Sequence, residues 1–147
     1  MSSQSPSSSP SVLSSLFASP HFLRRVLWAD AASGVGTALL QCEFADVFSP
    51  MLGLPTSLLL WSGYALAAFV LFIVWIATRP TIPAGPVWLL IAANAVWVFG
   101  CVGLLASDAV KPTVLGEVFL IVQAVAVGVL VELEWIGVRK IQPVPAW

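Results

Sequence analysis

The chain alternates long apolar stretches with short polar segments. Residues 58–78 and 87–106 contain no charged side chain, and residues 113–136 carry acids only near their two ends. A helix needs about 20 mainly apolar residues to cross the hydrocarbon core of a bilayer. These three stretches therefore predict three membrane-spanning helices.

A fourth span is predicted for residues 23–47, although this segment is more polar. It carries Asp30, Thr37 and Gln41, among other polar residues. An aspartate at the centre of a spanning helix costs about +2.5 to +3.5 kcal/mol. Asp30 follows Arg25 closely and so lies near an interface, where the cost is smaller. We expect a span that depends on neighbouring helices.

Proline and glycine separate the predicted spans. They are concentrated in residues 49–56 and 79–86, and the last break covers residues 108–112. Proline ends a helix because it has no N–H and its ring clashes with the preceding turn. Short connections place consecutive helices antiparallel. The predicted fold class is therefore all-α, with residues 22–141 forming a four-helix antiparallel transmembrane bundle.

The two ends of the chain are predicted to be tails. Residues 1–21 are rich in serine and proline and too poor in apolar residues to form a core, which predicts a disordered tail. Residues 142–147 form a short C-terminal tail. In a four-span arrangement five basic residues share one side and only Lys111 lies on the other: Arg24, Arg25, Arg79, Arg139 and Lys140. Basic residues accumulate on the cytoplasmic side, so both termini are predicted there.

Composition narrows the function classes. The chain is 59% hydrophobic and 9% charged, with a net charge of -1. A soluble domain carries about 25% charged residues, so an ordinary soluble enzyme is excluded. Nucleic-acid binding needs a basic face, which is absent. The expected partners are the lipid bilayer and either a second copy of the chain or another membrane protein.

Several polar residues are predicted to face the interior of the bundle. Asp30 and Thr37 share one face of the first span with Ser33. A polar face is unfavourable against lipid, so it points toward other helices. Glu132 on the last span lies at a depth matching that of Asp30. The candidate intramembrane site comprises five residues: Asp30, Thr37, Asn94, Gln123 and Glu132.

Two interpretations of these acids are open. Asp30 and Glu132 could share a protonation site, since intramembrane acids are functional candidates by default. Alternatively, the acids near the span ends, Glu134 included, pair with basic residues in a purely structural role. The four basic residues available as ion-pair anchors are Arg24, Arg25, Arg139 and Lys140.

Other chemistry has little support in the sequence. His21 is the only histidine, and the chain has neither a C-x-x-C pair nor a nucleotide-binding motif. We therefore expect no enzymatic activity, no metal and no cofactor. Cys42 and Cys101 are expected to be inert, although a disulfide between them stays open. Trp97 is expected to pack against Asn94 or donate a hydrogen bond to it.

Two small-xxx-small patterns predict close helix contacts. They are Gly63 with Ala67 and Ala124 with Gly128. Such pairs let a neighbouring backbone approach closely. We expect one tight contact on the second span and another on the last span.

The segment LRRVLWADAASG, residues 23–34, resembles a group of small four-helix bacterial inner-membrane proteins that open with an Arg pair and an Ala-Asp-Ala helix. The similarity extends from Leu23 to Lys140. It implies an inner-membrane location and a multi-pass topology, and no activity. The length and the acid in the first span are also similar to small multidrug-resistance transporters, which carry a glutamate there. Asp30 and Glu132 depart from that family's pattern.

Two functions follow as hypotheses. The first is a small non-enzymatic membrane protein that acts as an interaction or structural subunit. The second is a proton-coupled small transporter or channel subunit, with Asp30 and Glu132 as protonation sites and Asn94 and Gln123 along a path. Four helices leave little room for a pore, so the second hypothesis predicts an oligomer.

Overall fold

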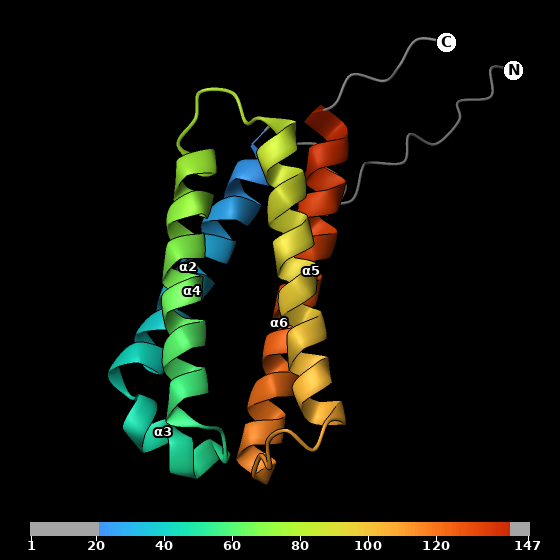
Figure 1. Cartoon of the computed structure of the whole chain (residues 1–147). Helices are drawn as coiled ribbons and strands as arrows, with labels where there is room; N and C mark the ends of the chain where they lie inside the picture. Colours follow the sequence, from blue (N-terminus) through green and yellow to red (C-terminus); the bar gives the residue numbers. More distant parts are fainter. Residues whose placement is uncertain (1–20, 142–147) are drawn as a thin grey trace, which may run out of the picture.

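A computed structural model describes residues 21–141, and over that range its regular secondary structure consists of helices joined by short connections, with no strand (Figure 1). The predicted tails, residues 1–20 and 142–147, lie outside the described residues. The elements, in chain order, are α2 (Phe22–Glu43), α3 (Ala45–Leu52), α4 (Thr56–Ala77), α5 (Ala84–Ala106) and α6 (Val114–Ile141).

Three of these helices, α4, α5 and α6, are long and apolar enough to cross a membrane. They coincide closely with the apolar stretches predicted as spans, residues 58–78, 87–106 and 113–136. The largest difference is at the end of α6, which continues beyond residue 136 to Ile141. The added turn carries Arg139 and Lys140, and cations are favourable at a helix C-terminus.

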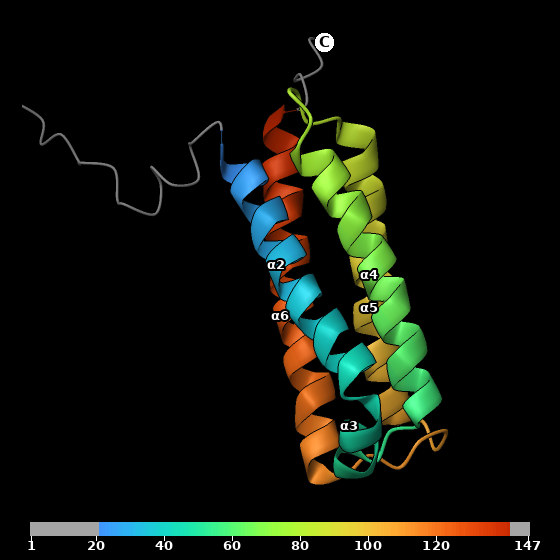
Figure 2. The ribbon, with the colours of Figure 1, turned by 90° about the vertical axis from the view of Figure 1, so that its left-hand side faces the viewer.

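The predicted first span is divided between two helices. α2 ends at Glu43, and α3 turns across the end of the bundle (Figure 2). α3 includes Pro50, where the sequence predicted a loop, and the residue that follows it is Gly53, whose φ is 67°. Glycine adopts this left-handed conformation without steric cost. The predicted segment boundary at Ser49 is therefore wrong by about one helical turn.

The helices pack as two pairs. α2 packs most extensively against α4 and α5 against α6, whereas α2 contacts α6 less and α4 barely touches α5. One apolar cluster, including Leu27, Ile76 and Leu90, fills the end where α2 begins and α6 ends. A second cluster, including Leu52 and Leu120, fills the end beside α3.

Close helix contacts fall on only one of the two predicted small-residue patterns. A Cβ atom added at Gly63 would lie 2.7 Å from Cys42 Sγ, so α4 and α2 meet there as predicted. A Cβ atom added at Gly128 would meet nothing within 4 Å, so the predicted contact on α6 is wrong. The tight positions on α6 are Gly116, which lies against the backbone carbonyl of Leu52, and Gly137, which lies against Leu23.

We expect Gly116→Ala to destabilise the fold, because backbone atoms cannot move aside as a flexible side chain can. Overpacking of this kind costs about 1–3 kcal/mol. Equilibrium unfolding in mixed SDS micelles measures the change. Gly128→Ala on the same helix is the matched control, and its free energy of unfolding should be unchanged or slightly higher. Equal effects of the two substitutions would contradict the α3–α6 contact.

Candidate intramembrane polar site

Three helices contribute one buried polar cluster, which consists of Asp30, Asn94 and Glu134. The exposed fractions of these residues are 5%, 4% and 0%. Asn94 Nδ2 donates to Asp30 Oδ2 at 3.1 Å and to Glu134 Oε2 at 3.2 Å. A side-chain amide nitrogen carries two protons, so a single amide group serves both carboxyl groups and joins α5 to α2 and α6.

The carboxyl groups of Asp30 and Glu134 accept hydrogen bonds from the same amide nitrogen, so they lie near each other in an apolar interior. Burial and a neighbouring like charge both disfavour the ionised form of a carboxyl group. Glu134 Oε1 is buried without a hydrogen-bond partner in the described part of the chain. The arrangement therefore favours a proton on at least one of the two carboxyl groups.

The basic residues predicted as ion-pair anchors do not reach these acids. Arg24 donates to carbonyl oxygens at the C-terminal end of α4, including that of Arg79 at 2.7 Å. Arg25 is exposed. Arg139 and Lys140 lie over aromatic rings, 4.5 and 5.7 Å from the ring centroids. Within residues 21–141 no cation forms an ion pair with the cluster, so the structural pairing predicted for its acids is wrong.

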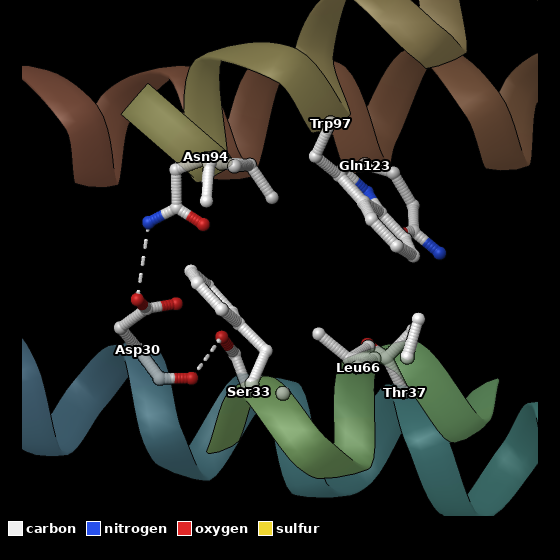
Figure 3. A pocket seen from close by; sticks show the side chains of 12 residues that line it. Asp30, Ser33, Thr37, Leu66, Asn94, Trp97 and Gln123 are labelled. Carbon is white, nitrogen blue, oxygen red and sulfur yellow. Dashed lines mark hydrogen bonds between the residues drawn. The ribbon is translucent and has the colours of Figure 1, made fainter. Parts of the chain in front are cut away.

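The cluster borders a cavity of about 180 Å³ between the two helix pairs. Figure 3 shows Asp30 and Asn94 facing each other at one end of it, with Thr37, Trp97 and Gln123 toward the other. Four of the five predicted site residues thus line one space. Leu66 and Phe69 add apolar walls.

The fifth predicted residue, Glu132, is not part of this arrangement. Its side chain is exposed, and Glu134 occupies the buried position instead. Two residues correspond to about 200° of rotation around an α-helix, so the prediction chose the wrong face of α6. The signal that it missed is Gly137 and Val138, which lie one turn beyond Glu134 and are also buried.

A second hydrogen bond joins the helices α5 and α6 farther along the cavity. Trp97 Nε1 donates to Gln123 Oε1 at 3.2 Å. The expectation that Trp97 donates to Asn94 is therefore wrong, because both the amide and the indole have other partners. Ser62 Oγ similarly donates to Gln41 Oε1 at 3.0 Å and joins α4 to α2.

A second, larger cavity of about 430 Å³ lies beside the first, toward the α3 end. Ala93, Trp97 and Gln123 line both spaces. The larger cavity has mainly apolar walls, which include Leu58, Leu59, Val96, Leu104 and Phe119. Cys101 also lines it, and both Cys101 and Cys42 are free thiols.

The described residues contain no group of three or more His, Cys, Asp or Glu side chains placed to hold a metal ion. Together, the apolar helices and the buried polar cluster define the chain as a helical membrane protein. Comparisons with protein-family models, curated proteins and solved structures found no match. Its chemistry is therefore argued from its own residues.

We expect Asn94→Leu to destabilise the protein, because two buried carboxyl groups lose their shared donor. Leaving buried polar groups unsatisfied costs about 1–3 kcal/mol each. Equilibrium unfolding in mixed micelles tests this. Glu132→Gln is the control and should stay within about 0.5 kcal/mol of the wild type. An unchanged stability of Asn94→Leu would contradict the hydrogen-bonded cluster.

Proposed function

We propose that the protein is a small proton-coupled transporter of the cell inner membrane, with Asp30 and Glu134 as its protonation site. The observation that carries the proposal is the carboxyl pair that shares Asn94 at one end of a partly open cavity between the helix pairs. Intramembrane acids that face a cavity are typical of proton relays. The proposal includes no enzymatic step.

A purely structural role for the cluster is the competing hypothesis. Buried polar groups can fix the register of packed helices, and an interaction subunit would need no more than that. A polar cluster that only fixes the register of the helices, however, does not require a cavity beside it. Here Asp30 and Asn94 line the smaller cavity, which shares Ala93, Trp97 and Gln123 with the lining of the larger one. The geometry therefore favours a site that a solute can enter.

A second copy of the chain is not needed to build this site. Both cavities are lined by residues of one chain, with contributions from α2, α4, α5 and α6. The proposal therefore replaces the predicted pore between subunits with a cavity inside each protomer. Glu134 replaces Glu132 as the second protonation site.

Proteoliposomes test the proposed proton exchange. We expect the wild-type protein to dissipate an imposed pH gradient, measured with an internal pH-sensitive dye, faster than empty liposomes do. Asp30→Asn should return the rate to that of empty liposomes, because the amide cannot release a proton. Glu134→Gln should do the same.

Glu132→Gln is the matched control, since it makes the same chemical change on the exposed face of α6. It should retain the wild-type rate. Identical rates for the wild type and for Asp30→Asn would contradict the proposal. They would instead favour the structural subunit.

We further propose that α2 is a fourth span and that both termini are cytoplasmic. α2 lies along α4 and α6, and its buried Asp30 and Gln41 face these helices rather than lipid. The ends of α2 and α6 that lead to the termini lie at the same end of the bundle (Figure 1). The connection after α4 then lies on the cytoplasmic side with Arg79.

Single cysteines test this topology in a Cys42→Ala, Cys101→Ala background. We expect an impermeant maleimide added to intact cells to label Ala109→Cys, in the α5–α6 connection. Thr81→Cys, in the α4–α5 connection, and a cysteine at Ser2 should react only after the cells are permeabilised. Labelling of Ser2→Cys from outside would show that α2 does not span.

A further inference from the structure

We propose that the larger cavity holds one acyl chain of a zwitterionic phospholipid from the leaflet at the α3 end of the bundle. The inference concerns the cavity of about 430 Å³ and does not depend on the proposed proton exchange, which involves the smaller cavity. It follows from four properties of the larger cavity, namely where it opens, how far it extends along the helices, what forms its walls and which charges lie at its end.

The larger cavity opens toward lipid between α4 and α5. These consecutive helices barely touch, although both line the cavity. Val96 on α5 lines the cavity and is nevertheless 70% exposed. Gly100, one turn further along α5, also lines it, and a Cβ atom added there would meet nothing within 4 Å. Both residues therefore lie at the mouth of the cavity, and in a bilayer this mouth faces hydrocarbon.

The length of the cavity matches one leaflet of a bilayer. Its lining on α5 runs from Ala93 to Leu104, close to the end of that helix at Ala106. This separation of eleven residues corresponds to a rise of about 16 Å. Half of a hydrocarbon core of about 30 Å is about 15 Å. The cavity therefore extends over the depth that the acyl chains of one leaflet occupy.

The walls of the cavity favour an acyl chain over water. Its polar side chains already bond one another, with Ser62 donating to Gln41 and Trp97 donating to Gln123. The remaining wall consists mainly of leucine, valine and phenylalanine side chains. Cavities lined by such apolar side chains stay dry, whereas lipid tails are as apolar as leucine. An acyl chain therefore fills this space at no cost in hydrogen bonds.

The charges at the α3 end favour a zwitterionic headgroup. Within residues 21–141 this end carries one basic side chain, Lys111, and four acidic ones: Glu43, Asp46, Asp108 and Glu117. Leu104 lines the cavity one turn before Asp108, so the headgroup of a lipid whose chain fills the cavity meets this charged region. The juxtaposition of like charges disfavours an anionic headgroup there. A zwitterionic headgroup carries no net charge and avoids this repulsion.

Proton–proton contacts measured in nanodiscs test the occupant. The protein is perdeuterated, exchanged so that its N–H groups carry protons, and placed in nanodiscs of protonated phosphatidylcholine. We expect a nuclear Overhauser cross-peak between the indole N–H of Trp97 and acyl methylene protons, because Trp97 lines the cavity. Loss of one indole signal in Trp97→Phe assigns the resonance.

Two glycines of α5 provide a matched pair of variants. Gly100→Leu fills the mouth of the cavity and should remove the acyl cross-peak of Trp97. Gly103→Leu makes the same change at a position that does not line the cavity, and it should keep the cross-peak. An added Cβ atom meets nothing within 4 Å at either position, so both variants should fold. Size-exclusion chromatography checks this.

Lipid retention tests the headgroup. The wild type and both glycine variants are extracted with a mild detergent from vesicles of equimolar phosphatidylcholine and phosphatidylglycerol, and bound lipid is measured by native mass spectrometry. We expect Gly100→Leu to retain several-fold less phosphatidylcholine than the wild type and an unchanged amount of phosphatidylglycerol. Gly103→Leu should retain both lipids as the wild type does.

A Trp97 indole signal with cross-peaks to water and none to acyl protons would overturn the inference, as would acyl cross-peaks that survive Gly100→Leu. An equal loss of both lipids in Gly100→Leu would contradict the zwitterionic headgroup. None of these results depends on proton flux through Asp30. The failure of this inference and the failure of the proposed function are therefore distinguishable.

Discussion

The buried carboxyl pair dominates the energetics of this small bundle. Asp30 and Glu134 lie in an apolar interior without a cation, and one amide group, that of Asn94, donates to both. Transfer of an isolated charge into such an interior is very costly. The cluster therefore persists only if helices α2, α5 and α6 stay in register and a proton stays within the pair. The packing of these three helices and the protonation of the carboxyl pair therefore depend on each other.

The arrangement of the helices explains why this cluster faces empty space. Small residues allow α2 and α4 to meet closely at Gly63, whereas α4 and α5 barely touch although they are consecutive. Apolar clusters lie at both ends of the bundle, the smaller cavity adjoins the contact between Asp30 and Asn94, and the larger cavity is lined by residues of the cluster beside α3. Asn94 links the two helix pairs through its hydrogen bond to α2 and also bonds α6. A change in the protonation of the pair would act directly on the contact between the two helix pairs.

Much of the fold follows from the length of the apolar stretches, because a spanning helix is a coarse feature. Which face of each helix is buried is a finer feature, and the length of an apolar stretch does not determine it. The polar face of α2 was found because Asp30 and Thr37 repeat at helical spacing, but α6 has several apolar faces of similar character. Glu132 and Glu134 are both plausible inward residues by composition, and only the packing of Gly137 against Leu23 selects Glu134. The loop predicted around Pro50 was wrong for a similar reason, because α3, a short helix at one end of the bundle, accommodates this proline.

The polarity of α2 has a consequence for assembly as well as for function. Unlike α4, α5 and α6, this helix is not apolar enough to be recognised as a span by composition. Its polar side chains become satisfied only when Asn94 and Ser62 supply partners for Asp30 and Gln41. Stable insertion of α2 therefore depends on helices that follow it in the chain. The residues that make the helix a poor span by itself are the ones that place polar side chains in the interior of the folded bundle.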